Sequence, residues 1–418
     1  MRLWESNSLA KRDHLRSVGT RQSPVATQEN PHHRGHRGHR GAQGKVIRSP
    51  TQIAYNSPSM TVAVRSFAKI NLGLYIGAAR ADGFHDLRTV YQTIALHDVI
   101  RVSVGRGSGI EILCKDPRVP LDSSNTCYRI AELVLEELGV NGRVSVEIEK
   151  RLPVQGGLGA ASSNAVATMV ALERALRKKL SGTARLRIAA EVGSDLPLFL
   201  VGGTTLGVGR GEEVYPLADL PSVPMVVVMP EVGVSTAQAF ADWDALVRRG
   251  AELRSGGRTN ASAPTRAGTG RSPDTTHTTA TGENRQLTRL GASDRLFEVG
   301  CALSAWLSGL PNTGAPAKRG SRAGNLLSDL VRTGIENDFE KVVFPLYPEL
   351  RDIKAALECA GSRYASLSGS GSTLYGLFQS RADAAKAVSG LRKQGLKAVA
   401  TSTLTRQKYW EKSLVVGR

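Results

Sequence analysis

The sequence predicts an α+β protein of two domains that meet at a cleft. Four observations support this expectation. Apolar and polar residues alternate over residues 62–76, which indicates a strand, and a glycine-rich segment at 153–165 leads into a helical pattern. The second half of the chain shows elements in the order β, α, β, β, α, β, which is the split βαβ, or ferredoxin-like, pattern. A chain of 418 residues is long enough for two domains of ordinary size.

Two segments differ in composition from the rest. Residues 1–59, with the low-complexity run "HHRGHRGHRG", are expected to form a disordered basic tail, and residues from about 250–288 a disordered insertion rich in Thr, Ser, Gly and Arg. The tail is a solvated segment, an organelle transit peptide or an over-extended start before Met60, and we expect it to be dispensable. Residues 1–59 have a balance of +7 and residues 248–290 one of +5, which leaves +6 of the total +18 for the remainder. The basic excess therefore says little about the folded part.

The remaining bulk properties favour a cytoplasmic protein. The four cysteines, at positions 114, 127, 301 and 359, form no CxxC pair, so we expect reduced thiols. The sequence contains no run of about 18 apolar residues, so we expect no transmembrane helix. The N-terminus lacks the apolar region of a secretion signal. We expect a monomer or homodimer that binds a small molecule, and neither nucleic acid nor a membrane.

The first domain is expected over residues 60–218. It opens with the strand at 62–76, in which Lys69 and Asn71 share one face. Further strands are predicted at 98–104, 110–114 and 143–151, and a helix at 125–138 is opened by Asn125 and closed by Gly139. A second helix is predicted from Ser162 to about Leu180, because apolar residues recur there at helical spacing.

The second domain is expected over residues 219–410. A strand at 224–231 opens it, and a helix at 348–360 has Pro348 in its first turn. The segment "YASLSGSGSTLYGLF" predicts two strands around a glycine loop. The box Ser380-x-x-Asp383 opens another helix, and a strand at 397–404 completes the set.

The segment "PVQGGLGAASSNA", residues 153–165, has the character of a phosphate loop. It lacks the lysine of a P-loop and the spacing of a dinucleotide fingerprint. Its small residues let the backbone approach a ligand, and the helix that follows offers unpaired N–H groups and a partial positive charge. Ser162 and Ser163 could cap this helix or offer hydroxyls to a phosphate or a metal. The alternative is a tight strand-to-helix turn with a serine cap.

Other candidate residues have ordinary interpretations when each is taken alone. Asp195 would be a helix cap, Lys69 a solvated charge and His85 a turn histidine, and "SGSGST" at 368–373 a flexible hairpin loop. Together, however, two glycine loops, a strand lysine and an aspartate in this order resemble the GHMP kinase family, named for galactose, homoserine, mevalonate and phosphomevalonate. The segments similar to its three motifs are "SFAKINLGL", "PVQGGLGAASSNA" and "SLSGSGSTLYGLF".

The resemblance covers roughly residues 61–235 and 325–405. It implies a two-domain fold, with a ribosomal-protein-S5-like N-terminal domain and the ferredoxin-like C-terminal domain. It also implies transfer of a phosphoryl group from ATP, with Mg2+, to a hydroxyl of a small molecule. Asp195 would accept the hydroxyl proton, and Lys69 would pair with Asp195 and offset charge on the transferred group.

The resemblance assigns further residues to binding. The residues expected to bind ATP are Pro153, Val154, Gln155, Gly156, Gly157, Leu158, Gly159, Ala160, Ala161, Ser162 and Ser163, with Gly369, Ser370 and Gly371 of the third motif. Ser163 is the expected Mg2+ contact, although the sequence does not decide between it and Ser162.

The segment "ADGFHDLRT" is similar to that of family members acting on a cytidyl diphosphate sugar alcohol. His85 would then hydrogen-bond the cytosine and Phe84 or Tyr91 would pack on it. Asn71 and Thr236 would orient the sugar alcohol.

Two alternatives remain open at this stage. A homoserine- or mevalonate-type kinase would share the three motifs but would not need "ADGFHDLRT". A non-catalytic RNA-binding protein is the alternative of another class, because related βαβ folds occur in translation proteins. It would require clustered Lys and Arg with aromatic residues, and the sequence has no such cluster outside the tail and the insertion.

Overall fold

The computed structural model describes residues 51–52, 61–256 and 335–415. The expected tail, apart from the two-residue strand β1 (Thr51–Gln52), lies outside the described residues, as does most of the expected insertion. Helix α6 (Thr236–Gly256) extends a few residues past position 250, near which the insertion was expected to begin.

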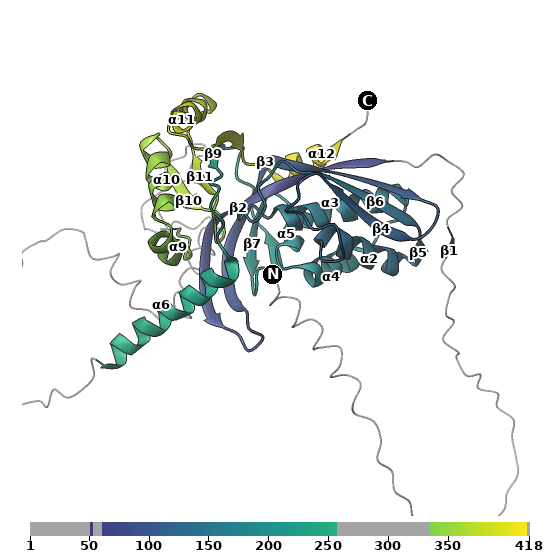
Figure 1. Cartoon of the computed structure of the whole chain (residues 1–418), viewed down its shortest axis with the longest axis horizontal. Helices are drawn as coiled ribbons and strands as arrows, with labels where there is room; N and C mark the ends of the chain where they lie inside the picture. Colours follow the sequence, from purple (N-terminus) through teal and green to yellow (C-terminus); the bar gives the residue numbers. More distant parts are fainter. Residues whose placement is uncertain (1–50, 53–60, 257–334, 416–418) are drawn as a thin grey trace, which may run out of the picture. The chain divides into compact units, whose positions relative to one another are not determined.

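The larger sheet of the described chain has seven strands (Figure 1). Their order is β13-β2-β3-β6-β4, and β7 pairs with β3 and β8 with β7. The strands are β2 (Val62–Ala79), β3 (His85–Gly105), β4 (Gly109–Cys114), β6 (Arg143–Glu149), β7 (Thr204–Val208), β8 (Glu213–Pro216) and β13 (Leu414–Val415). The strand predicted at 98–104 is therefore the end of a much longer one. A short strand β5 (Val140–Asn141) pairs with β1.

Helices α2 (Thr126–Leu138), α3 (Ala160–Ala175), α4 (Gly182–Val192) and α5 (Leu196–Val201) share an apolar core with this sheet (Figure 1). The predicted boundaries of α2 are confirmed, with Asn125 as N-cap and Gly139 left-handed at φ 59°. The prediction that α3 runs to Leu180 is wrong. The helix ends at Ala175 because Arg177 adopts φ 51° and the backbone N–H of Leu180 bonds Glu173 instead.

The second sheet confirms the ferredoxin-like pattern. Its four antiparallel strands have the order β10-β11-β9-β12. The elements follow the chain as β9 (Pro224–Val228), α6, α9 (Glu340–Leu346), α10 (Pro348–Cys359), β10 (Tyr364–Leu367), β11 (Leu374–Leu377), α11 (Arg381–Lys393) and β12 (Ala398–Ser402). Ser380 caps α11, as predicted. An apolar cluster that includes Val226, Leu350 and Leu391 joins the sheet to its helices.

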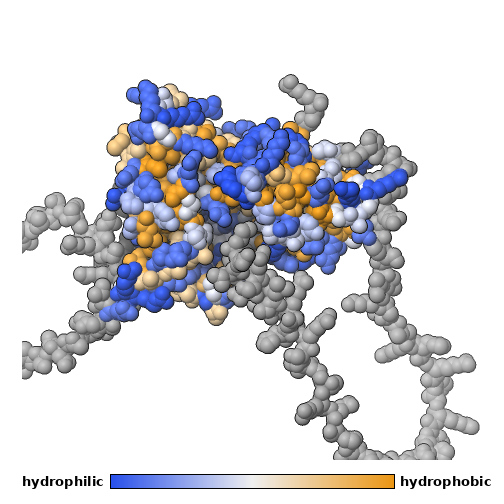
Figure 2. Space-filling view, in the orientation of Figure 1, coloured by the Kyte–Doolittle hydropathy of each residue, from blue (hydrophilic) through white to orange (hydrophobic). Residues whose placement is uncertain are grey.

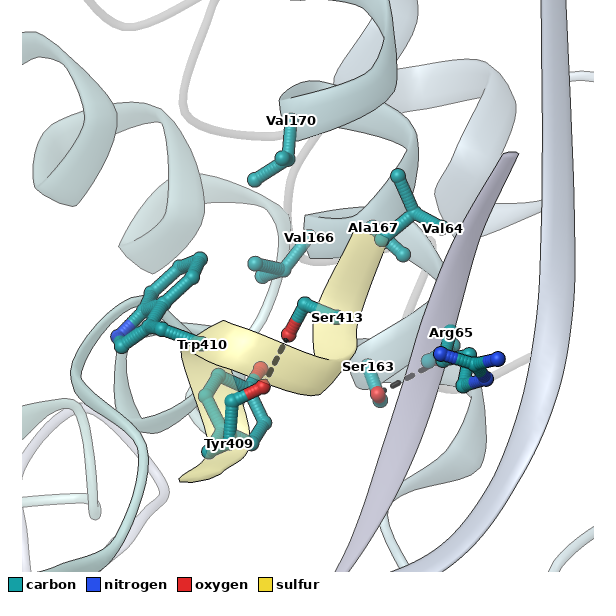
Figure 3. A pocket seen from close by; sticks show the side chains of 10 residues that line it. Val64, Arg65, Ser163, Val166, Ala167, Val170, Tyr409, Trp410 and Ser413 are labelled. Atoms are coloured by element: carbon teal, nitrogen blue, oxygen red, sulfur yellow. Dashed lines mark hydrogen bonds between the residues drawn. The ribbon is translucent and has the colours of Figure 1, made fainter. Parts of the chain in front are cut away.

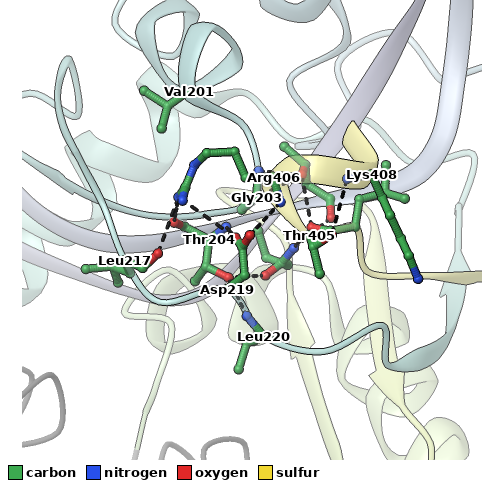
Figure 4. Close-up of polar contacts among 12 residues, drawn as sticks. Val201, Gly203, Thr204, Leu217, Asp219, Leu220, Thr405, Arg406 and Lys408 are labelled. Atoms are coloured by element: carbon green, nitrogen blue, oxygen red, sulfur yellow. Dashed lines mark hydrogen bonds and ion pairs between the residues drawn. The ribbon is translucent and has the colours of Figure 1, made fainter. Parts of the chain in front are cut away.

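The last helix, α12 (Arg406–Ser413), returns to the first sheet. Figure 4 shows Asp219 accepting hydrogen bonds from the backbone N–H of Thr204 (3.2 Å) and of Arg406 (2.7 Å), while the Arg406 guanidinium donates to the Thr204 carbonyl (3.0 Å). The Tyr409 hydroxyl donates to the carbonyl of Phe199 in α5 (2.8 Å). The end of the chain therefore supports the short helix α5, whose six residues could not form a stable helix alone.

A buried carboxylate fixes the entry to the glycine-rich segment. Asp98 of β3 is fully buried and accepts hydrogen bonds from Lys150 Nζ and from the backbone N–H groups of Arg151 and Leu152, all at 2.7 Å. Asn164 of α3 donates a fourth at 3.0 Å. Asp98 thus ties β3, the end of β6 and α3 together at the point where the glycine segment begins.

Apolar and polar side chains are interspersed over the face drawn in Figure 2. The large exposed apolar side chains come from several separate elements, and include Leu113, Leu186, Tyr215, Leu346 and Trp410. Among the described residues no helix has the length and apolar character needed to cross a bilayer.

We expect Asp98→Asn to lower the free energy of unfolding by about 3–5 kcal/mol, because it leaves the Lys150 ammonium buried beside an amide that turns a donor toward other donors. Denaturant unfolding would measure the change. The control is Glu111→Gln, which removes an exposed pair with Arg143 and should change stability by less than about 1 kcal/mol. Equal effects of the two substitutions would contradict the role given to Asp98.

Candidate functional site

The structure brings Lys69 and Asp195 together from distant parts of the sequence. Lys69 Nζ lies 3.4 Å from Asp195 Oδ2, with the lysine side chain 5% exposed and the aspartate 33%. Lys69 comes from the middle of β2, where the ladder to β3 is irregular between Phe67 and Lys69. Asp195 stands at the N-cap position of α5, but its carboxylate caps no N–H there. Neither residue fits the ordinary interpretation of a solvated charge or a helix cap.

Tyr91 of β3 contacts both members of the Lys69–Asp195 pair. Its hydroxyl donates to Asp195 Oδ1 at 3.0 Å, and Lys69 Nζ lies 5.5 Å from the centre of its ring. Burial, and secondly the charge of Asp195, hold the pKa of the Tyr91 phenol well above its ordinary value, so the group stays protonated and donates. The ring of Tyr91 is buried and its hydroxyl bonds Asp195, and the expectation that Tyr91 or Phe84 packs on a cytosine stays a prediction.

Two glycines that the sequence analysis missed make room for Tyr91. A Cβ on Gly207 of β7 would overlap the Tyr91 ring, and one on Gly211 would lie 2.6 Å from its hydroxyl oxygen. Gly211 also has φ 100°, which disfavours any other residue. Only the register of β7 on β3 reveals this requirement, so the sequence pattern gave no signal for it.

Asn71 positions Lys69. Its side-chain oxygen accepts from Lys69 Nζ at 2.8 Å, and its Nδ2 donates to the Thr89 hydroxyl at 2.7 Å. Thr89 in turn donates to the Gly73 carbonyl. Asn71 is buried and both polar ends of its side chain bond the protein, while its expected contact to a sugar alcohol stays a prediction.

The glycine segment forms a backbone cradle beside Lys69. Gln155, Gly157 and Gly159 have left-handed φ values of 59°, 73° and 66°. The backbone N–H of Lys69 bonds the Leu158 carbonyl at 3.0 Å, which anchors the loop to β2. Helix α3 begins at Ala160 with Gly159 as N-cap and no side-chain cap. Its first N–H groups are therefore suited to an anion.

The serines of α3 do not cap it, contrary to one expectation, because they lie inside its first turn. Ser163 is buried: its hydroxyl donates to the Phe67 carbonyl (2.6 Å) and accepts from Ser66 (2.7 Å). Figure 3 shows it on the side of α3 that faces α12, beside a cavity of about 10 Å³, room for one water molecule. The metal contact of Ser163 stays a prediction. The neighbouring Ser162 is only half-buried and is therefore easier for a ligand to reach.

The third motif lies directly on the glycine segment. The Ser368 hydroxyl donates to the Gly157 carbonyl (3.0 Å), and the backbone N–H of Thr373 donates to the Gly156 carbonyl (3.3 Å). A Cβ on Gly369 would lie 3.6 Å from Lys69 Nζ, so this loop also reaches the Lys69–Asp195 pair.

Two further contacts hold the third loop. Asn337, which the sequence analysis missed, donates from Nδ2 to the carbonyls of Leu367 (2.9 Å) and Gly369 (2.7 Å). The Thr236 hydroxyl, at the start of α6, bonds that of Ser370 at 2.8 Å. Ser370, predicted to bind ATP, and Thr236, predicted to bind the sugar alcohol, are therefore direct neighbours.

His85 is the first residue of β3, and Thr93, the register partner of Lys69, lies further along the same strand. It is 7% exposed, its Nε2 lies 2.8 Å from Asp244 Oδ1, and its ring stacks on Phe240 at 4.9 Å with 13° between the planes. Phe84 is half-buried, with the Arg210 guanidinium 4.9 Å from its ring centre. Phe240 and Asp244 are one helical turn apart on α6, a spacing that could have signalled a shared face.

The comparisons agree with this geometry. The family descriptions "GHMP kinases N terminal domain" and "GHMP kinases C terminal" match residues 125–203 and 317–397. The 4-diphosphocytidyl-2-C-methyl-D-erythritol kinase of Solibacter usitatus (strain Ellin6076) is 33% identical over 76% of this chain and 81% of its own length. That of Moorella thermoacetica (strain ATCC 39073 / JCM 9320) is 31% identical over 81% of this chain and 98% of its own. A crystal structure of 4-(cytidine 5'-diphospho)-2C-methyl-D-erythritol kinase superimposes on this chain with a TM-score of 0.54 at 27% sequence identity. The match covers 82% of this chain and 98% of the chain in that crystal structure.

We expect Gly157→Ala to weaken ATP binding by at least about tenfold, because its Cβ would overlap the Ser368 carbonyl and separate the two loops. Calorimetric titration with ATP would measure the loss. Gly139→Ala is the matched control, since Gly139 has a similar φ of 59° but nothing within 4 Å of a built Cβ. It should cost about 1 kcal/mol of stability and leave ATP affinity unchanged. Unaltered ATP binding by the Gly157 variant would rule out the cradle as an ATP site.

Proposed function

Since this chain belongs to the GHMP kinase family, we propose that it transfers the γ-phosphoryl group of ATP to the 2-hydroxyl of 4-diphosphocytidyl-2-C-methyl-D-erythritol, a step of the non-mevalonate isoprenoid pathway. The observation that carries the proposal is the contact of Lys69 and Asp195 between two interlocking glycine loops. A cytoplasmic location, where ATP is available, is part of this proposal.

Phosphoryl transfer depends mainly on positioning and charge stabilisation. The cradle of residues 155–159 and the uncapped start of α3 would hold the triphosphate through backbone N–H groups. The Lys69 ammonium would offset negative charge on the transferred group. This arrangement explains why the loop needs no lysine of its own.

Asp195 is proposed to accept the proton of the substrate hydroxyl. Its side chain is one-third exposed, so a hydroxyl can reach it, while Lys69 and Tyr91 fix both oxygens from the protein side. Tyr91 cannot itself be the base, because its raised pKa keeps the phenol protonated. Tyr91 is therefore a positioning residue for the carboxylate.

Mg2+ fits this site as a companion of ATP. No three His, Cys, Asp or Glu side chains of the described residues form a group that could hold a metal alone. Mg2+ at nucleotide sites commonly needs only one or two protein ligands besides phosphate oxygens, and the half-buried Ser162 in the first turn of α3 offers one such donor beside the cradle. When bound, Mg2+ would neutralise charge on the β- and γ-phosphates.

The cytosine is proposed to bind at His85, Phe84 and Phe240. His85 presents a polar ring edge held by Asp244 and a ring face held by Phe240. Aromatic rings with a polar edge suit a nucleobase, and hydrogen bonding to a base edge discriminates strongly against analogues. A homoserine- or mevalonate-type kinase has no need of such a group of residues.

We expect Asp195→Asn to lower kcat by about 10²–10⁴-fold, because the amide cannot accept the hydroxyl proton. ATP affinity should persist, since the cradle does not involve Asp195. Steady-state kinetics and calorimetric ATP titration would give the two values. Near-normal turnover would remove Asp195 from the role of base.

The substrate assignment is tested by offering purified protein 4-diphosphocytidyl-2-C-methyl-D-erythritol, homoserine and mevalonate, with ATP, in the presence and absence of Mg2+. We expect phosphorylation of the cytidyl compound alone, and only with Mg2+. Preference for homoserine or mevalonate would overturn the substrate while leaving the family intact. For the RNA-binding alternative, a salt-sensitive gel shift retained by the chain without residues 1–59 and 250–288, together with no kinase activity, would be decisive.

A further inference from the structure

Arg210 lies on a tight turn between the two parts of the proposed acceptor site. The turn joins β7 and β8, and its glycines Gly209 and Gly211 have φ values of 68° and 100°. The Gly209 carbonyl accepts from the backbone N–H of Leu87 at 2.6 Å. Gly211 lies against the Tyr91 hydroxyl. The backbone therefore fixes Arg210 alongside β3, between Leu87 and Tyr91.

The Arg210 side chain is held in a defined position. Its guanidinium carbon is 4.9 Å from the centre of the Phe84 ring, and Nε lies 2.9 Å from Glu212 Oε1. Glu212 also accepts from the backbone N–H of Arg210 at 2.7 Å. A guanidinium carries five N–H groups, and the contact to Glu212 through Nε leaves the four on the terminal nitrogens for other acceptors. The side chain is 31% exposed, so a solute can reach it.

The strand β3 sets the direction of the acceptor substrate. His85 and Tyr91 are six residues apart, an even number, so both face the same side of β3 at a separation of about 20 Å. The proposed function puts the cytosine at His85 and the reacting hydroxyl at Asp195, which Tyr91 contacts. In the substrate the diphosphate lies between these two groups. It must therefore pass along this stretch, which the Arg210 guanidinium borders on the side of Phe84.

We propose that Arg210 binds the diphosphate of the acceptor substrate and so makes the protein select cytidine diphosphate derivatives over cytidine derivatives without phosphate. This inference rests on the proposed function. The diphosphate bridge carries two negative charges, and a planar guanidinium can donate two parallel hydrogen bonds to phosphate oxygens. Lys69 is engaged by Asp195 and Asn71 and reaches the site from the ATP side. Lys69 would therefore serve the phosphoryl group transferred from ATP, and Arg210 the diphosphate of the acceptor.

The test compares the affinities of cytidine and cytidine 5'-diphosphate by calorimetry, with the ATP site filled by a non-hydrolysable ATP analogue. The wild type should bind the diphosphate at least about tenfold more tightly, consistent with charged hydrogen bonds. Arg210→Gln should lose this preference while binding cytidine within about twofold of the wild type. An Arg210→Gln variant that keeps the full preference overturns the proposal.

Arg101→Gln is the matched control. Arg101 also lies on β3, has a side chain 35% exposed and pairs with Glu149 at 2.7 Å, but sits at the far end of the strand. This variant should keep the wild-type preference, and a loss equal to that of Arg210→Gln would show a general charge effect and overturn the proposal. If Arg210→Gln binds neither compound, Arg210→Lys keeps a cation near Phe84 and decides the matter. Its preference should fall severalfold with the loss of the planar fork, and a wild-type ratio would overturn the assignment.

The proposed function fails separately from this inference. Wild-type protein that neither phosphorylates the cytidyl substrate nor binds cytidine overturns both. Wild-type protein that does both, while Arg210→Gln retains selectivity for the diphosphate, overturns only the role of Arg210.

Discussion

A buried ammonium group is the constraint around which this molecule is arranged. An unpaired charge in a protein interior costs several kcal/mol, so Lys69 needs partners that the fold must supply. Asn71 comes from the same strand, two residues on, but Asp195 comes from a helix more than 120 residues away. The six-residue helix that carries Asp195 is in turn held by Tyr91 at its start and by Tyr409 near its end. The burial of this one cation therefore depends on the positions of β3, α5 and α12.

The same strand joins the two halves of the described chain. Residues of the second half donate to carbonyls of β2: Tyr375 to Asn71 (2.7 Å) and Tyr364 to Leu72 (3.0 Å). The backbone N–H of Ile76 donates to the buried Asp338 (2.9 Å). Burial, the largest cause, raises the pKa of both tyrosines, so they remain donors over the ordinary pH range. The strand that aims Lys69 is thus also the strand against which the third motif is built, and the two glycine loops meet because β2 fixes both.

The sequence predicted the parts of this arrangement that depend on local chemistry. Glycine patterns located the two loops, alternation located β2, and capping residues located the ends of α2 and the start of α11, since each of these follows from the residues of the segment itself. It could not assign the side of α3 on which Ser163 lies, because that depends on the neighbouring carbonyl of Phe67. Tyr91 and Asn71 were expected to touch substrate, and only the packing of β3, β7 and α5 shows that they also hold Asp195 and Lys69. Phe240, Asp244 and Asn337 were missed because each acts through a partner far away in sequence.

This division of contacts separates the two substrates of a kinase physically. The groups assigned to ATP lie on β2, on the start of α3 and on the third motif, and they are tied to one another by hydrogen bonds to backbone carbonyls of the glycine segment. The groups assigned to the acceptor lie at the beginning of β3, on the turn between β7 and β8 and on the first turns of α6, and they meet through side chains. Side-chain contacts at a turn and a helix can change by substitution without disturbing a backbone cradle. One scaffold can therefore keep its phosphoryl chemistry while its acceptor specificity changes, which is what a family containing kinases for chemically different alcohols requires.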